Sequence, residues 1–171
     1  MNTQAIFERL DQILGDQVKL DWQTEHAGDP FALVNPEHWH TACQVLRDDE
    51  ALTFDFLRSL TAVDRPEQGQ LELVVHLFAY KHRQAFVLKT LCPREEGQIQ
   101  TVSDIWPAAN WHEREVFDLF GLDFEGHPDM RRLLMPDDWV GHPLLKDYQE
   151  EESYRGIPTR RPGYPIAGSK K

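Results

Sequence analysis

The sequence predicts an α+β fold, in which helices pack on one mixed or antiparallel sheet and an extended C-terminal arm follows. Segments with the helical spacing of apolar residues and segments with strand alternation are mixed along residues 1–120. Two expected strands are close enough to form a hairpin, which favours a sheet layered with helices. Residues 121–171 contain six of the eleven prolines and six of the ten glycines, and no period persists there. We therefore expect a globular domain over 1–120 and an arm over 121–171.

The first part of the chain predicts one helix and two short strands. Apolar residues at helical spacing predict a helix over 3–14, and Gly15 suits its end. Alternation of apolar and polar residues predicts a half-buried strand over 18–22. A turn at 28–30 then leads to a second short strand over 31–34.

The next segment predicts a second helix. Asn35 followed by Pro36 is typical of a helix start, and this helix is expected to end near Arg47. Four of its residues are expected to face the core: Trp39, Ala42, Cys43 and Leu46.

Three longer strands and a third helix complete the predicted domain. The strands are expected at 52–62, 70–80 and 84–91, and residues 81–83 are short enough to join the last two as a hairpin. Pro107 suits the start of the final helix, which is expected to run to Phe120 with Gly121 as its stop.

Composition excludes several classes of function. A formal net charge of −11 argues against nucleic acid, because phosphate recognition needs clustered Lys and Arg, and against charge-driven docking on an anionic membrane. Cys43 and Cys92 could form one disulfide, but the polar, acidic N-terminus is unlike a signal peptide and favours free, buried thiols. The nearly apolar run over 73–80 is far shorter than the ~20 residues that span a bilayer. We expect a protein that is soluble or is held at a membrane by another protein.

No cofactor site is expected in this chain. Two cysteines without C-x-x-C spacing cannot supply the four thiolates of an all-cysteine iron–sulfur cluster. No G-x-G-x-x-G follows an expected strand. Residues 121–126 have the glycine spacing of a phosphate loop, but His127 and Pro128 stand where Lys and Ser or Thr are required.

A metal centre has weak support. His112 and Glu115 are three residues apart on an expected helix and could form a two-ligand clip, but no H-E-x-x-H pattern accompanies them. A free-standing metal-dependent hydrolase that uses His112, Glu115 and His127 is an alternative hypothesis, which metal analysis of the purified chain would test.

The charged helix that precedes the arm is expected to have a structural role. Glu113 shares a stripe with apolar residues, so its carboxylate must be neutralised or hydrogen-bonded. Arg114 and Asp118 are four residues apart and can pair locally. Arg131 and Arg132 lie downstream and can bind the remaining carboxylates. These acids are therefore expected to fix the exit of the arm from the domain.

The arm carries features typical of a partner-binding segment. Apolar and aromatic residues among its glycines and prolines are expected to anchor it on partner subunits, and we expect it to order only against them. The expected interface and assembly residues are Glu113, Arg114, Glu115, Asp118, His127, Arg131, Arg132, Trp139, His142 and Lys146.

The stretch from 113 to 147 resembles one known family, the 30 kDa subunit of NADH:quinone oxidoreductase, respiratory complex I. Residues that fall on the signature of this family without a gap are Glu113, Arg114, Glu115, Asp118, Leu119, Phe120, His127, Arg131, Leu133 and Leu134. The resemblance extends more loosely through Leu60–Asp64 and Ser103–Trp111.

The resemblance implies a non-catalytic subunit of the peripheral arm of complex I, placed next to the 49 kDa subunit and the small iron–sulfur subunits. It implies no catalytic, cofactor-binding or metal-binding residue in this chain. The FMN, iron–sulfur clusters and quinone of the holoenzyme would be bound by other subunits, and this chain would have no activity alone. It also implies a peripheral position on the cytoplasmic side of a bacterial inner membrane, or its matrix or stromal equivalent, through partner subunits.

One related alternative stays open. The same subunit occurs in complexes that are fed by another donor: a photosynthetic ferredoxin-dependent complex, an F420-type dehydrogenase or a membrane-bound hydrogenase. No residue of this chain is expected to contact the donor, so only the identity of the partner subunits would distinguish these complexes.

Overall fold

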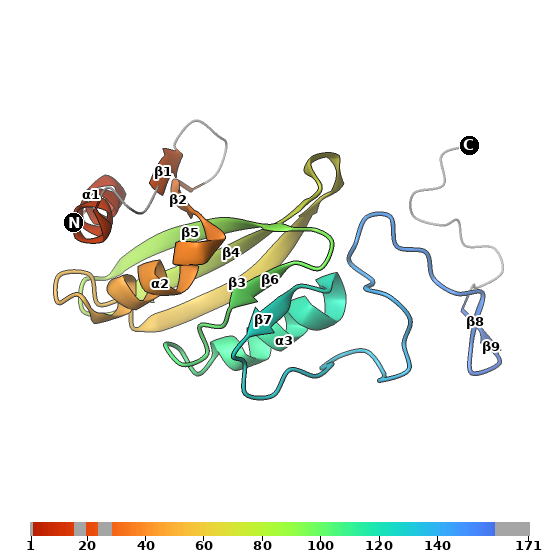
Figure 1. The fold of residues 1–171 in the computed structure, drawn as a ribbon. Helices are drawn as coiled ribbons and strands as arrows, with labels where there is room; N and C mark the ends of the chain where they lie inside the picture. Colours follow the sequence, from red (N-terminus) through yellow and green to blue (C-terminus); the bar gives the residue numbers. More distant parts are fainter. Residues whose placement is uncertain (1, 16–19, 24–28, 160–171) are drawn as a thin grey trace.

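The computed structural model describes residues 2–15, 20–23 and 29–159. Its main sheet has five strands in the order β1-β2-β5-β4-β3 (Figure 1). The strands are β1 (Leu20–Gln23), β2 (Phe31–Val34), β3 (Phe56–Arg65), β4 (Gln70–Ala79) and β5 (Gln84–Pro93). Only the β2–β5 pair among these neighbours is parallel. The sheet is therefore mixed, and the predicted α+β class is confirmed.

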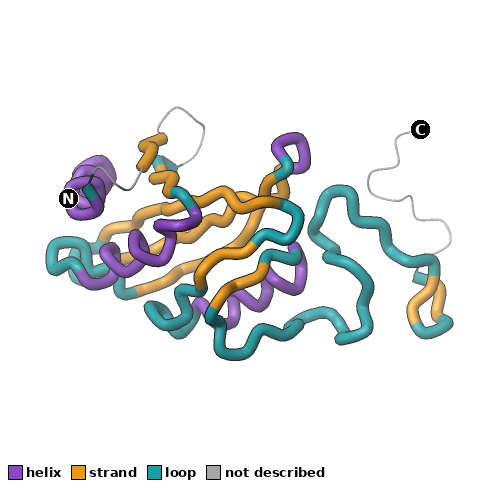
Figure 2. Tube along the Cα trace, in the orientation of Figure 1, coloured by secondary structure: helices purple, strands orange, loops and turns teal. Residues whose placement is uncertain are grey.

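Three α-helices accompany the sheet in the described part of the chain: α1 (Thr3–Leu14), α2 (Trp39–Asp48) and α3 (Ala109–Phe120). They belong to one layer, because a single hydrophobic core joins residues of all three helices to one face of the sheet. Alternate strand residues such as Leu60, Leu73 and Leu88 supply that face. Figure 2 shows the helices beside the long strands, with the arm leaving the layered part.

Helices α1 and α2 lie where the sequence predicted them. The side chain of Asn2 accepts a hydrogen bond from the N–H of Ala5 at 2.8 Å, and Gly15 ends α1 with a φ of +68°. The four predicted inward residues of the second helix, Trp39, Ala42, Cys43 and Leu46, are all buried. However, Pro36–His38 form a 3₁₀ turn, and Asn35 makes no side-chain cap.

Two predicted boundaries differ from the structure. Strand β3 begins at Phe56 instead of Leu52, because residues 49–54 form a tight turn in which Thr53 has a φ of +44°. Helix α3 begins at Ala109, two residues after Pro107. The part of the first predicted strand before Leu20 lies outside the described residues.

The packed core continues past the predicted end of the domain. Leu122 and Phe124 are buried, and β7 (Asp123–Glu125) pairs in parallel with β6 (Gln98–Gln100). Sequence analysis predicted neither of these short strands. The boundary between domain and arm at residue 121 stays a prediction. The first residues after α3 nevertheless pack with residues that precede the helix.

The remaining described chain, up to residue 159, runs as an extended segment from β7 to a small hairpin of β8 (Ser153–Tyr154) and β9 (Ile157–Pro158) (Figure 1). Cys43 and Cys92 are free and buried, which confirms the prediction of free thiols. No helix in the described ranges is both long and apolar enough to cross a membrane.

Candidate assembly site: buried carboxylates that hold the arm

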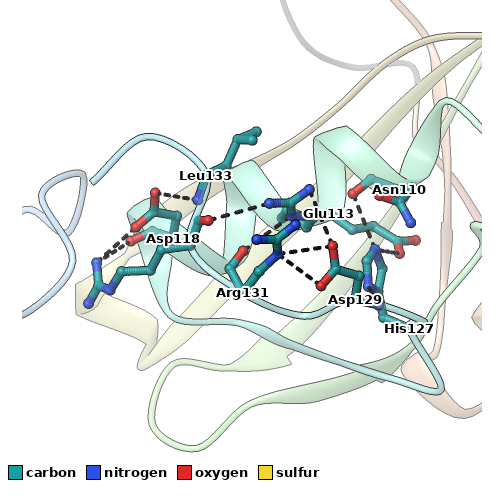
Figure 3. Close-up of polar contacts among 9 residues, drawn as sticks. Asn110, Glu113, Asp118, His127, Asp129, Arg131 and Leu133 are labelled. Carbon is teal, nitrogen blue, oxygen red and sulfur yellow. Dashed lines mark hydrogen bonds and ion pairs between the residues drawn. The ribbon is translucent and has the colours of Figure 1, made fainter. Parts of the chain in front are cut away.

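Helix α3 presents its charged residues to two different surroundings. Glu113, Arg114 and Asp118 are buried, whereas Glu115 is exposed to solvent. Arg114 and Asp118, four positions apart, share one face of the helix. Figure 3 shows the buried carboxylates of this helix with the arm segment that passes beside them.

Asp118 binds the backbone of the arm. Its Oδ2 accepts hydrogen bonds from three successive backbone N–H groups, at 3.1, 2.6 and 2.8 Å, which belong to Leu133, Leu134 and Met135. Its Oδ1 accepts from Nη1 of Arg132 at 2.8 Å. Since the Asp118 side chain has no exposed surface, this carboxylate satisfies an otherwise unpaired stretch of backbone and receives a matching charge.

The electrostatics of Asp118 follow from these contacts. Burial by itself acts to raise the pKa of this carboxyl, but the three backbone N–H groups and Arg132 outweigh it, so the pKa lies below its ordinary value. The ionised form is therefore the form that the arm recognises.

Arg114 also binds the arm, although not as predicted. Its Nε donates to the carbonyl of Arg131 at 3.2 Å and its Nη2 to the carbonyl of Arg132 at 3.4 Å. Its Nη1 lies 3.7 Å from Oδ2 of Asp129. The predicted local pair between Arg114 and Asp118 is wrong, because each side chain binds the arm instead of the other.

The two neighbouring arginines of the arm have different surroundings. The Arg132 side chain is 16% exposed and binds Asp118 together with the carbonyl of Gly141 at 3.1 Å. The Arg131 side chain is 71% exposed and pairs with Asp129, two residues earlier, at 2.9 Å. The prediction that downstream arginines bind the acids of the helix therefore holds for Arg132, whereas the side chain of Arg131 pairs within the arm.

Glu113 occupies a second buried position on the helix. Its carboxylate accepts hydrogen bonds from the N–H of Val102 at 2.7 Å and from the hydroxyl of Thr101. Burial, and to a smaller extent the nearby charge of Asp104, raises the pKa of Glu113 to about 7 in spite of these hydrogen bonds. The prediction that this carboxylate must be neutralised or hydrogen-bonded is confirmed.

His127 and His142 fix turns of the arm. Nδ1 of His127 accepts from the N–H of Asp129 at 3.0 Å, and its Nε2 lies 3.2 Å from the carbonyl oxygen of Asn110. Nδ1 of His142 lies 2.9 Å from the carbonyl oxygen of Asp118. Since a carbonyl can only accept, the ring nitrogen beside it carries the proton in each case.

A second carboxylate that sequence analysis did not select also holds the arm. Asp64, at the end of β3, accepts two hydrogen bonds from Arg94, at 2.8 and 3.2 Å, and one from the backbone N–H of Lys146 at 2.8 Å. Arg94 also pairs with Asp147. The hydrogen bonds from Arg94 are the main reason that the pKa of Asp64 is lowered. Asp64 lies in the Leu60–Asp64 stretch that the family resemblance covers, which was the only signal for it.

Lys146 and Trp139, which are expected at the partner interface, also make contacts within the chain. Lys146 contacts the domain through its backbone, and its side chain is exposed. Trp139 packs on the ring of Tyr154, with ring centroids 5.2 Å apart. Asp138 accepts from the hydroxyl of Tyr154 at 2.6 Å and pairs with Arg155 at 2.9 Å. These contacts hold residues 136–159 of the arm together. The described part of the arm is thus held by the domain and by itself, which differs from the prediction that it orders only against partner subunits.

The described residues contain no group of three His, Cys, Asp or Glu side chains that could hold a metal ion. Of the three residues of the hydrolase hypothesis, His127 has both ring nitrogens beside backbone groups, and Glu115 points to solvent. The residues of this site therefore bind the backbone of the arm and fix its turns.

Comparison with known proteins finds a family model, described as the 30 kDa subunit of the respiratory-chain NADH dehydrogenase, that matches residues 32–154. A protein from Chloroherpeton thalassium, named as the C subunit of NADH-quinone oxidoreductase, is 44% identical over 128 residues, which are 74% of this chain and 53% of the relative. The chain thus spans about half the length of that relative. A protein of the same name from a Roseiflexus species is 38% identical over 148 residues, which are 86% of this chain and 84% of the relative.

Two solved structures have the same fold. The structure of a membrane-bound sulfane sulfur reductase, an archaeal respiratory membrane complex, contains a similar chain with a TM-score of 0.66 and 27% identity, which covers 79% of this chain and 77% of that one. A trypsin-resistant fragment of Nqo5, residues 1–134, has a TM-score of 0.59 and 27% identity, which covers 75% of this chain and 99% of the fragment.

Proposed function

Since this chain belongs to the family of the 30 kDa subunit of the respiratory-chain NADH dehydrogenase, we propose that it is a structural and assembly subunit of an NADH-quinone oxidoreductase of the complex I type. The observation that carries this proposal is the use of the buried charges of α3. Asp118 and Arg114 bind five backbone groups of the arm between them, in residues 131–135. The segment that most resembles the family, residues 113–147, thus uses its helix to position the backbone of the arm.

The arm that these charges position presents apolar side chains to the outside. Its backbone is held by Asp118 and Asp64, while four of its apolar residues are exposed: Leu134, Val140, Leu144 and Ile157. Exposed apolar groups on a fixed backbone are typical of a surface that another protein covers. Such a surface loses little conformational entropy when the partner binds. This surface is the proposed contact with partner subunits.

The proposed partners are the 49 kDa subunit and the small iron–sulfur subunits of the complex. In this proposal the FMN, the iron–sulfur clusters and the quinone belong to other subunits, and this chain contributes position instead of chemistry. It would lie on the cytoplasmic side of the membrane, or the equivalent compartment of an organelle, and be attached through its partners.

A related complex with another electron donor is the second candidate. The likeness to a chain of an archaeal membrane-bound sulfane sulfur reductase supports a related complex in general, because that respiratory complex is named for a different reaction, the reduction of sulfane sulfur. The residues that bind the arm would serve both candidates equally. Identification of the subunits that co-purify with this chain distinguishes them.

The proposal is tested with the assembled complex. A Leu134→Ser/Leu144→Ser double variant removes exposed apolar side chains and leaves the carboxylate contacts in place. We expect less assembled complex in membranes and near-normal NADH:quinone turnover per assembled complex. Asp11→Asn, an exposed change on α1, is the matched control. Full assembly with collapsed turnover would contradict a structural role.

A further inference from the structure

Most of the arginines and lysines that the structure describes are paired with carboxylates. Salt bridges involve the majority of the arginines and lysines that the structure describes: Arg9, Arg65, Lys89, Arg94, Arg114, Arg131, Arg132 and Arg155. With 29 acidic against 18 basic residues, acidic partners are abundant. A cluster of basic residues without such partners therefore needs an explanation.

Three basic residues without such partners lie in or near the turn between β4 and β5. Lys81 and Arg83 lie in the turn, and Arg58 lies in the neighbouring strand β3, where the pairing register shifts. All three are exposed, and none has a salt bridge to a carboxylate among the described residues. Lys81 donates only to the backbone carbonyl of Glu50, at 3.2 Å.

Three aromatic rings lie at the same end of the sheet as these basic residues. Tyr80 and Phe56 are 61% and 44% exposed. The ring of Tyr80 contacts Phe56 with centroids 5.5 Å apart and Phe78 with centroids 5.2 Å apart, both edge to face. Their neighbours Leu57, Leu77 and Ala79 are buried in the core. Strand alternation therefore places the three rings on the sheet face that the helices leave open.

We propose that these six residues, Phe56, Arg58, Phe78, Tyr80, Lys81 and Arg83, form a docking surface for an acidic segment of a partner protein that also carries an apolar side chain. We call it the hairpin patch. Exposed rings flanked by arginine are the composition of strong contact points at protein interfaces. The unpaired charges complement carboxylates that the partner supplies.

Other occupants fit the hairpin patch less well. A second copy of this chain in a symmetric dimer would bring like charges together, because the same patch faces itself across the axis. Nucleic acid and an anionic membrane would meet three basic residues, but also a chain with a net charge of −11.

The hairpin patch is separate from the arm. It lies at the Phe56 end of β3, whereas Asp64 binds the arm near the other end of the same strand (Figure 1). Eight residues of extended strand separate the two by roughly 26 Å. The inference rests on the proposed membership of an assembly with other subunits, but it does not depend on what the arm contacts.

A photo-crosslinking experiment in the native complex tests the proposal. Tyr80 is replaced by p-benzoylphenylalanine, which keeps an aromatic ring at this position, and the complex is purified from membranes and irradiated. We expect an adduct with a peptide of another subunit that contains Asp or Glu. Raising the NaCl concentration should lower the yield, because exposed charge pairs are screened. The same probe at Thr61, which is exposed on the same sheet face, is the matched control and should give little adduct.

Charge reversal then separates this contact from chance proximity. An Arg58→Glu/Arg83→Glu variant should lower the adduct yield about tenfold per assembled complex, and Lys in place of the partner's linked acids should restore it. An adduct with lipid, nucleic acid or a second copy of this chain would overturn the proposal. So would the absence of an adduct, or an adduct that neither salt nor charge reversal changes.

Discussion

The backbone N–H of Lys146 donates a 2.8 Å hydrogen bond to the carboxylate of Asp64, which lies 82 residues earlier in the chain. Asp118 binds the arm in the same way through Leu133, Leu134 and Met135. Both carboxylates are buried. The arm is therefore fixed at two places by acids that bind its main chain, and at these four residues the side chains are not what the acids recognise.

Acid is expected to release the arm before it unfolds the core. The pKa values of Asp64 and Asp118 are both lowered from an ordinary value of 3.8. Their contribution to stability is therefore complete above the unfolded pKa and is lost as the pH falls through the folded values. Hydrogen exchange followed during acidification should show amides 133–135 and 146 losing protection before the strands β4 and β5. Simultaneous loss in arm and sheet would contradict this.

Asp118→Asn should loosen the arm at neutral pH. The change removes the negative charge that balances Arg132 and turns part of the acceptor into a donor. Breaking a buried pair costs about 3–5 kcal/mol, so amides 133–135 should exchange at least about a hundredfold faster. Asp129→Asn is the control, since Asp129 is half-exposed and its loss should change exchange little. Equal effects of the two changes would contradict this role of Asp118.

Arg131 and Arg132 should differ on substitution although they are adjacent. Arg132→Ala leaves buried Asp118 without its cation and should lower the free energy of unfolding by about 3 kcal/mol or more. Arg131→Ala removes an exposed pair with Asp129 and should cost less than about 1 kcal/mol. Urea denaturation of the isolated full chain measures both values. A larger loss of unfolding free energy for Arg131→Ala than for Arg132→Ala would contradict this prediction.

Glu113 should make the chain less stable as the pH rises through neutrality. Burial raises its pKa from 4.5 to about 7 in the folded chain. Its contribution is therefore complete below about 4.5 and is lost as the pH rises through about 7, a change of about 3 kcal/mol. Glu113→Gln should remove this part of the pH dependence in urea titrations from pH 4 to 8.5. Glu115→Gln, on the exposed face of the same helix, should retain it.

Gly121→Ala should be more damaging than an equivalent change elsewhere. Gly121 has a φ of +80°, and a Cβ there would lie 2.8 Å from the ring of His142. Gly69 has a φ of +64° with nothing within 4 Å of a Cβ, so Gly69→Ala measures the backbone strain alone, about 1 kcal/mol. The excess cost of Gly121→Ala, about 1–3 kcal/mol, reports the packing of His142. Equal melting temperatures for the two variants would exclude this contact.

Much of the domain could be predicted because each of its main elements has a local pattern. The apolar stripe of residues 3–14 and the hairpin over 70–93 needed no tertiary information. Strands β6 and β7 escaped prediction because three residues are too few for a period, and their pairing depends on α3 bringing them together. The start of β3 was misplaced because Leu52 and Phe54 are buried in a turn and resemble strand residues.

The sequence predicted which residues form the candidate site better than it predicted what those residues contact. Glu113, Asp118 and Arg132 were found because a charged helix with buried acids must have partners. Spacing suggested that Arg114 pairs with Asp118, but Arg114 instead donates to backbone carbonyls that sequence patterns do not reveal. Asp64 was missed for the same reason, since its partner in the arm is an N–H group that any residue but proline could supply.

The order of protein synthesis decides when the two arm-binding carboxylates can meet their partners in the arm. Asp64 and Asp118 emerge from the ribosome before the residues that bind them, and domains fold largely in that order. Until residues 132–135 are complete, Asp118 must stay hydrated, because a buried charge without a partner is costly. Asp64 can already pair with Arg94 and lacks only the N–H of Lys146. Closure of the arm thus follows the synthesis of residues 132–146, and the surface that the arm presents forms only after that point. A chain interrupted before residue 146 would lack that surface, so a partner that recognises it would not bind such a fragment.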